Sequence, residues 1–220
     1  MTIQEGVDYL QGDKIEIPTV SRVDLPKFLV DQGYKVGAEI GVYKGRFTRL
    51  FLEAGLKMYG VDPYMAYDDY DMPNREFQKR QDYLAWRVQK ELREFPDFTL
   101  VRKTSMEAIK DFKRGDLDFV YIDGHHGFKY IAEDLWEWSK IVKDGGIISG
   151  HDYNHANKGA KDPTILHPKF VIDAYTAARK IKPLYIVGTQ AEADGLGRGD
   201  TAYDRWRSWF FFNKWEYLKA

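Results

Sequence analysis

Short apolar segments alternate with longer segments of helical period along the chain. Seven of the apolar segments have the composition of strands, and they are 36–40, 56–61, 98–101, 117–122, 147–149, 184–187 and 209–212. Between them, apolar residues recur every three or four positions, as the residues Phe128, Ile131, Leu135, Trp138 and Val142 do, which is the spacing of a helix with one buried face. Strands joined by helices favour a parallel sheet with helices on both faces. The pattern therefore predicts a doubly wound α/β fold with seven strands.

The remaining segments fit a single domain over residues 1–220. Helices are expected over 24–32, 47–54, 75–95 and 170–181, and the first of them belongs to an N-terminal helical extension over 1–35. Two polar stretches, 63–97 and 153–169, are expected to be insertions that shape a binding pocket at the strand ends. The Gly- and Asp-rich stretch 188–204 is expected to form a hairpin arm or a loop.

The composition excludes several classes of function. Lys and Arg number 33 against 34 Asp and Glu, so a net charge of −1 gives no bulk attraction to nucleic acid. The chain has no cysteine, which excludes disulfides, thiolate zinc sites and cysteine nucleophiles. No apolar run approaches the ~18 residues of a membrane span, and residues 1–13 lack the apolar core of a signal peptide. We therefore expect a cytoplasmic protein that binds neither nucleic acid nor membranes.

The ends of the predicted strands carry the candidate chemistry, because ligands bind there in doubly wound sheets. After the first predicted strand, Gly41 and Gly45 stand between that strand and a helix, where the backbone turns tightly and comes close to a ligand. No glycine lies between them, so the turn suits a nucleoside better than a dinucleotide. Asp62, about twenty residues further on, is placed to accept the hydroxyl groups of a ribose. Both features also occur in turns that bind nothing.

Acidic and imidazole side chains follow the next two strands. Asp123 and His126 come after 117–122, and His151 and Asp152 come after 147–149. Neighbouring parallel strands would bring these groups together, and buried carboxylates need a compensating cation. Oxygen-rich ligation fits Mg²⁺ or Mn²⁺. The alternative is that these groups cap helices and hydrogen-bond to one another.

Four motifs carry a further signal. They are Glu39-Ile40-Gly41-x-x-x-Gly45, Val61-Asp62-Pro63-Tyr64, Val120-Tyr121-Ile122-Asp123-Gly124-x-His126, and Gly145-Gly146 through Gly150-His151-Asp152-Tyr153. In this order, at these strand ends, they resemble the class I S-adenosylmethionine-dependent methyltransferases. Within that class the chain is similar to a small group related to the catechol-type and macrolide-sugar O-methyltransferases.

The resemblance implies a Rossmann-like sheet of seven strands, mostly parallel, with an antiparallel last strand. It implies that Glu39, Gly41 and Gly45 surround the methionine part of S-adenosylmethionine, that Asp62 holds the ribose, and that Ser105 lies near the adenine. The carboxylate of Asp123 also favours the positively charged cofactor. In metal-dependent members of the family the ligands match Asp123, His151 and Asp152. His126 stands where those enzymes carry a lysine base, and His151 stands where a carboxylate is more usual.

The expected reaction is O-methylation of a small polar acceptor, a sugar or a phenol, with Asp123 and His126 as the catalytic residues and a divalent metal as an assistant. Three other functions compete with it. A metal-dependent hydrolase would use the Asp and His cluster, a nicotinamide-dependent dehydrogenase would need the absent middle glycine, and a binding module would keep only the cofactor pocket. The aromatic C-terminal segment fits either a buried last strand or a homodimer interface.

Overall fold

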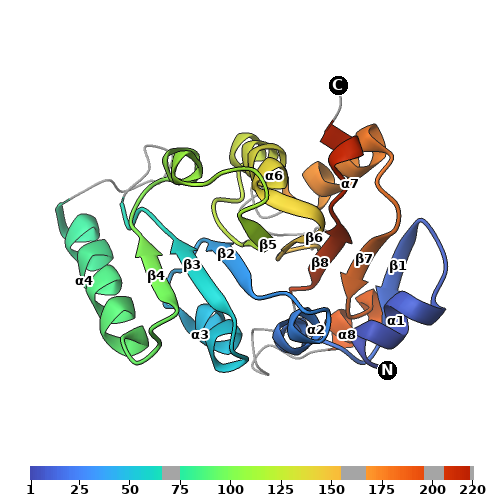
Figure 1. Ribbon diagram of the computed structural model, residues 1–220, viewed down its shortest axis with the longest axis horizontal. Helices are drawn as coiled ribbons and strands as arrows, with labels where there is room; N and C mark the ends of the chain where they lie inside the picture. Colours follow the sequence, from blue (N-terminus) through green and yellow to red (C-terminus); the bar gives the residue numbers. More distant parts are fainter. Residues whose placement is uncertain (66–74, 155–166, 196–205, 219–220) are drawn as a thin grey trace.

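An eight-stranded sheet forms the centre of the computed structural model, which describes residues 1–65, 75–154, 167–195 and 206–218 (Figure 1). The strands are β1 (Lys14–Ile17), β2 (Val36–Ile40), β3 (Lys57–Val61), β4 (Phe98–Val101), β5 (Leu117–Ile122), β6 (Val142–Gly150), β7 (Leu184–Val187) and β8 (Ser208–Phe212). Their order across the sheet is β1-β7-β8-β6-β5-β2-β3-β4. Only β8 runs antiparallel to its neighbours, β6 and β7, which confirms the expected antiparallel last strand.

The helices lie on both faces of this sheet, as the alternating pattern predicts (Figure 1). The α-helices are α1 (Ile3–Tyr9), α2 (Leu25–Asp31), α3 (Arg46–Glu53), α4 (Arg75–Leu92), α5 (Ser105–Ala108), α6 (Phe128–Ile141), α7 (His167–Arg179) and α8 (Gln190–Gly195). Short 3₁₀ helices are η1 (Arg22–Asp24), η2 (Ile109–Asp111) and η4 (Trp215–Leu218).

The prediction of seven strands is one short, because the N-terminal extension is not wholly helical. Residues 14–17 have the sequence Lys-Ile-Glu-Ile, and only the two isoleucines are buried. This alternation buries Ile15 and Ile17 on one face of a short strand. That strand, β1, pairs in parallel with β7 and forms one edge of the sheet. Four residues with strict alternation are too few to distinguish an edge strand from a loop by sequence pattern alone.

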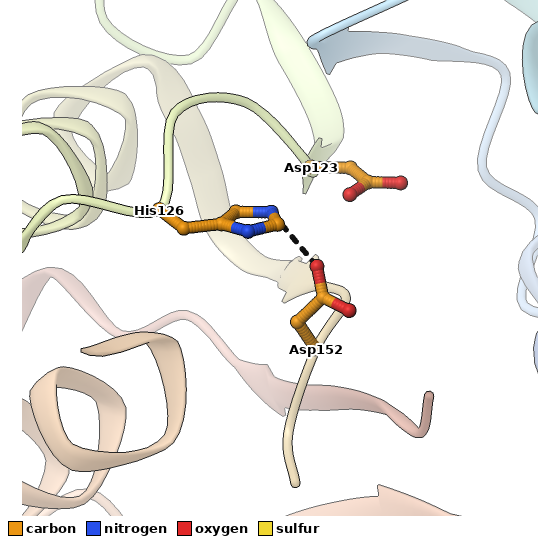
Figure 2. A group of neighbouring side chains, drawn as sticks. All are labelled: Asp123, His126 and Asp152. Atoms are coloured by element: carbon orange, nitrogen blue, oxygen red, sulfur yellow. Dashed lines mark ion pairs between the residues drawn. The ribbon is translucent and has the colours of Figure 1, made fainter. Parts of the chain in front are cut away.

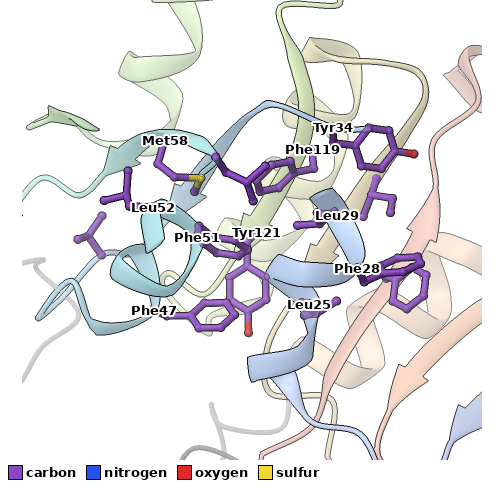
Figure 3. Packing of buried hydrophobic residues seen from close by; sticks show 14 of the residues in the cluster. Leu25, Phe28, Leu29, Tyr34, Phe47, Phe51, Leu52, Met58, Phe119 and Tyr121 are labelled. Carbon is purple, nitrogen blue, oxygen red and sulfur yellow. The ribbon is translucent and has the colours of Figure 1, made fainter. Parts of the chain in front are cut away.

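A hydrophobic layer covers each of the two faces of the sheet. Along β5, Phe119 and Tyr121 pack toward α2 and α3 (Figure 3), whereas Val120 and Ile122 pack toward α6 and α7. This alternation follows from the two-residue period of a strand. Because both faces are buried, the register of β5 is fixed, and with it the position of the residues that follow Ile122.

The two predicted insertions, 63–97 and 153–169, and the stretch 188–204 fall partly outside the described residues. Residues 66–74 of the first insertion and 155–166 of the second lie outside them, and so do residues 196–205 of the stretch 188–204. The described part of that last stretch contains α8, where a hairpin arm or loop is expected.

Gly41 lies where the ends of β2 and β5 come close to each other. Its φ is +94°, and a Cβ atom there would lie 2.2 Å from the carbonyl oxygen of Asp123. The adjacent backbone is tied by the Asp123 amide, which donates to the carbonyl of Ile40 at 2.8 Å. The glycine is therefore required by packing between the ends of β2 and β5, as well as by its φ angle.

We expect Gly41→Ala to destabilise the protein far more than Gly55→Ala. Gly55 has a similar φ of +88°, but no atom lies within 4 Å of the point that a Cβ would occupy there, so its substitution carries only the backbone cost of about 1–2 kcal/mol. Gly41→Ala adds a collision with backbone atoms, for a total of about 3–5 kcal/mol. Urea denaturation of both variants measures the difference, and equal losses would show that the two strand ends can move apart.

Candidate active site

A cavity of about 830 Å³ opens at the carboxyl ends of the strands. This volume lies within the range of about 300–1,000 Å³ that is usual for ligand sites. Five of the six predicted cofactor residues line it, and they are Glu39, Gly41, Asp62, Ser105 and Asp123. The sixth, Gly45, does not line it; it is the N-cap of α3, and a Cβ there would contact Leu92 and Val88 of α4. The geometry thus gathers the predicted residues, Gly45 excepted, around one space.

Glu39 lies at the floor of this cavity, near the end of β2. Its side chain is buried, and one carboxyl oxygen accepts a hydrogen bond from the hydroxyl of Thr48 on α3. Burial raises the pKa of Glu39 to about 8, and the nearby charge of Asp123 contributes in the same direction. Without a cationic ligand, Glu39 therefore holds a proton at neutral pH.

Asp62 orders the turn that follows β3. One carboxylate oxygen accepts the amide of Tyr43 at 2.9 Å, and the other accepts the amide of Tyr64 at 2.9 Å. Both tyrosines have positive φ angles, 50° and 47°, so the carboxylate holds two loops in conformations that cost energy. Burial raises the pKa of Asp62 despite these bonds. The turn role and the cavity-lining role of Asp62 therefore coexist.

Ser105 belongs to a buried network that sequence reasoning did not find. Its hydroxyl accepts a hydrogen bond from the indole Nε1 of Trp138 at 2.7 Å and donates one to the carboxyl of Asp134. Asp134 is buried, lines the cavity, and has a pKa that burial raises to about 7. The available signal was a carboxyl group on the apolar face of α6, between Ile131 and Leu135.

The acidic and imidazole residues converge as predicted (Figure 2). The pairing of Ile122 with Gly150 places Asp123 beside the residues that follow β6. His126 Nε2 lies 2.8 Å from Asp152 Oδ2. His151 Nδ1 lies 3.3 Å from Asp152 Oδ1 and 3.7 Å from Asp123 Oδ1.

Burial and ion pairing act against each other in this cluster. Burial lowers the pKa of His151, but the charges of Asp123 and Asp152 outweigh it and raise that pKa to about 9. Burial likewise lowers the pKa of His126, and the hydrogen bond to Asp152 more than reverses this effect. Burial raises the pKa of Asp152, but the charge of His151 and two hydrogen bonds hold it well below its usual range. The cluster is therefore largely compensated by its own imidazoles.

The donor set of the cluster also fits a divalent ion. One ligand atom each from Asp123, His126 and Asp152 lies within 4.8 Å of the others, which differs from the predicted set by His126 in place of His151. A small second cavity of about 10 Å³ borders all four side chains, and this is about the space of one water molecule. Carboxylate and imidazole donors suit Mn²⁺ and similar ions.

Arg22 is a second residue that the sequence did not reveal. It belongs to η1, in the N-terminal extension, and is 8% exposed. Its side chain lines the main cavity, and Nη1 lies 3.5 Å from Asp123 Oδ2. No local pattern places an arginine in a polar N-terminal turn beside a strand end about a hundred residues further along the chain.

The family and the similar structures agree with this geometry. The profile of a methyltransferase-domain family matches residues 38–153, which contain all of the predicted site residues. The chain belongs to the class I S-adenosylmethionine-dependent methyltransferases. None of the curated proteins matches the chain.

Solved methyltransferases share the fold at low sequence identity. An O-methyltransferase from Bacillus cereus in complex with SAH is 14% identical, with a TM-score of 0.61 over 87% of this chain and 80% of that chain. TomG from Streptomyces achromogenes, an O-methyltransferase in complex with SAM, is 12% identical, with a TM-score of 0.58 over 87% and 79%. The N-methyltransferase NodS from Bradyrhizobium japonicum is 15% identical, with a TM-score of 0.55 over 88% and 94%. Similar folds therefore methylate different atoms.

The competing functions find no support in these results. The matched family and the similar structures are methyltransferases, and neither favours a metal-dependent hydrolase.

Among the described residues, no helix is long and apolar enough to cross a bilayer.

The methyltransferase should lose stability between pH 4.5 and pH 8 through Glu39. Its pKa is raised from 4.5 to about 8 on folding, so in this window only the unfolded state releases the proton. The free energy of unfolding then falls with pH, by at most about 1.4 kcal/mol per pH unit, and the loss stops above pH 8. Glu39→Gln keeps an acceptor for Thr48 and cannot ionise, so it removes this contribution.

Urea denaturation at pH 5, 6, 7 and 8 measures this effect as the difference between the wild type and Glu39→Gln. All other titrating groups are common to both proteins and cancel. A difference that stays constant across the series would mean that Glu39 is already ionised in the folded protein.

Proposed function

We propose that this enzyme transfers the methyl group of S-adenosylmethionine to a hydroxyl of a small polar acceptor, a sugar or a phenol. The observation that supports this best is the pairing of His126 with Asp152 beside Asp123, at the rim of the cavity that the cofactor residues line. A base at this place serves an acceptor that must lose a proton. The structural similarity to O-methyltransferases agrees with this reaction.

The cofactor would occupy the part of the cavity between β2, β3 and the segment after β4. Glu39 and Gly41 lie beside the methionine part in this arrangement, Asp62 beside the ribose, and Ser105 with Asp134 near the adenine. The carboxylate of Asp123 then lies next to the sulfonium, where a negative charge favours the charged cofactor over its neutral product.

Proton removal falls to His126. The hydroxyl oxygen of the acceptor attacks the methyl carbon, the bond from carbon to sulfur breaks with its electron pair going to sulfur, and the hydroxyl proton must leave. With Nε2–H donated to Asp152, the neutral imidazole carries its lone pair on Nδ1, which would take this proton. Asp152 fixes the tautomer and stabilises the imidazolium that forms.

A divalent ion would assist at the same place. Asp123 and Asp152 would hold it together with one of the two imidazoles, and the predicted set with His151 leaves His126 available as the base. When bound, Mg²⁺ or Mn²⁺ lowers the pKa of a coordinated hydroxyl and orients it.

The acceptor would enter from the side of the first insertion. The main cavity is lined by Met65, Phe77 and Arg80 of this insertion. Pro168, which belongs to the second insertion, lines the small second cavity. Mixed aromatic and charged walls suit a ring that carries hydroxyl groups.

Ligand-dependent thermal stability tests the cofactor and the metal. We expect S-adenosylhomocysteine to raise the melting temperature of the wild type, since a ligand that binds only the folded state stabilises it by mass action. NADH should leave it unchanged. Mn²⁺ should raise it in the wild type but not in Asp152→Asn, and EDTA should reverse the effect. Stabilisation by NADH and not by adenosylhomocysteine would contradict the proposed function.

Two substitutions separate chemistry from cofactor binding. His126→Gln should lower kcat by about 10²- to 10⁴-fold, the usual contribution of a general base, and Asp123→Ala should abolish turnover. Both should weaken the binding of adenosylhomocysteine much less. Radiolabelled methyl transfer to a panel of phenols and sugars gives kcat, and calorimetry gives the affinity.

Asp97→Ala is the matched control for this pair. Asp97 is exposed and lies outside both cavities, so its substitution should change neither kcat nor affinity. Wild-type turnover in Asp123→Ala would show that Asp123 has no part in the chemistry.

A further inference from the structure

The N-terminal segment adds one cation to the floor of the main cavity. Residues 22–24 form the 3₁₀ turn η1, between β1 and α2, and Ser21 and Asp24 close this turn through a hydrogen bond of 2.8 Å from the Ser21 amide to the Asp24 carboxylate. Within the turn, Val23 points to solvent at 49% exposure, whereas Arg22 points inward at 8%. The turn thus delivers an arginine from outside the matched family segment, 38–153, into the site.

Arg22 is held in place by neighbours from three elements. Its guanidinium lies over the ring of Phe47 of α3, 5.1 Å from the centroid, and it hydrogen-bonds to the buried hydroxyl of Tyr121 of β5. Figure 3 shows the rings of Phe47 and Tyr121 next to each other, between α3 and α2. These contacts fix the orientation of the guanidinium before any ligand arrives, which lowers the entropic cost of binding.

The contact between Arg22 and Asp123 is longer than a strong ion pair. The distance of 3.5 Å between Nη1 and Asp123 Oδ2 exceeds the about 2.7–2.9 Å of a short charge-assisted hydrogen bond. Arginine presents five donors in a planar fork, and that fork matches a carboxylate in a bidentate manner. The guanidinium can therefore exchange its long contact with Asp123 for a contact with the carboxylate of a ligand.

The charges around Arg22 match those of the methionine part of the cofactor. That part carries a sulfonium, an ammonium and a carboxylate. The floor of the cavity offers two carboxyl groups, Glu39 and Asp123, and one guanidinium, Arg22. The carboxyl groups suit the two cationic groups of the ligand, and the guanidinium suits its anion.

The other basic side chains of the cavity wall are less suitable. Lys44, Arg46, Arg80 and Lys129 also line it, but Lys44 is partly exposed and the other three are exposed, so water and salt screen their charges. A buried guanidinium acts in a medium of lower effective dielectric constant, where its attraction for a carboxylate is stronger.

We propose that Arg22 binds the carboxylate of the methionine part of S-adenosylmethionine, an inference that rests on the proposed function. The N-terminal extension then completes the cofactor site, because Arg22 is the one buried basic side chain among the described residues that line the main cavity. Asp123 and Arg22 separate partly when the cofactor binds, because the carboxylate of the cofactor takes the place of the Asp123 side chain on one edge of the guanidinium.

A cycle of two ligands and two proteins tests this proposal. Decarboxylated S-adenosylmethionine keeps the nucleoside, the sulfonium and the amine, and lacks only the carboxylate. Arg22→Met keeps a flexible apolar side chain next to Phe47 and removes the charge. The wild type should bind S-adenosylmethionine about 10- to 100-fold more tightly than the decarboxylated form. In Arg22→Met this ratio should fall to within about threefold of one.

The control is Lys27→Ala. Lys27 lies on α2, is exposed, and pairs only with Asp31 among the contacts of the described residues. Its loss changes the net charge by the same amount as Arg22→Met, and it should leave the ligand ratio as in the wild type. A change in the ratio for Lys27→Ala would assign the effect to long-range charge, and so would contradict a direct contact.

The outcomes distinguish this proposal from the proposed function. If the wild type binds neither ligand, the function itself is wrong. If it binds both with similar affinity, or if Arg22→Met weakens both ligands equally, the cofactor function stands and Arg22 does not contact the carboxylate. Should Arg22→Met fail to fold, a wild-type ratio near one would still overturn the proposal.

Discussion

The parallel register of β2, β5 and β6 is the constraint on which the site depends. Ile40 pairs with Ile122, and Ile122 pairs with Gly150, so the three strands end at the same level. Residues that are more than a hundred positions apart in sequence, such as Glu39 and Asp152, thereby border one region. A slip of one residue would turn the side chains of β5 to the opposite faces, and the two hydrophobic layers oppose such a slip. The hydrophobic core therefore fixes the geometry of the chemistry.

Much of the fold and of the site follows from the sequence for this reason. The strands β2 to β8, the helical crossovers and the meeting of Asp123 with His151 and Asp152 all follow from hydrophobic period and from the rule that parallel strands end together. β1 was missed because four alternating residues at a sheet edge carry little signal. Arg22 was missed because its position depends on how an N-terminal turn packs, which no local pattern encodes. Asp134 was missed although it stands on the apolar face of a helix, because that signal does not say which partners the carboxyl group meets.

The acidic cluster shows how burial and charge set protonation at this site. Four ionisable side chains lie together at the ends of two strands, and Asp152 is shared by both imidazoles. Burial alone would neutralise each group, but mutual pairing keeps Asp152 ionised and raises the pKa of both histidines. The two histidines next to the two carboxylates supply the positive charge that keeps Asp152 ionised. Glu39 is also buried but has no histidine beside it among the described residues, and it holds its proton instead.

The close approach of Gly41 to the Asp123 carbonyl has a mechanical consequence. The glycine turn borders the main cavity, and so does the segment after Asp123, which carries His126. Since their backbones touch with no side chain between them, neither loop can shift without displacing the other. The spacing between the glycine turn and the loop of His126 is thus set by direct backbone contact, with no flexible side chain between them that could adjust it.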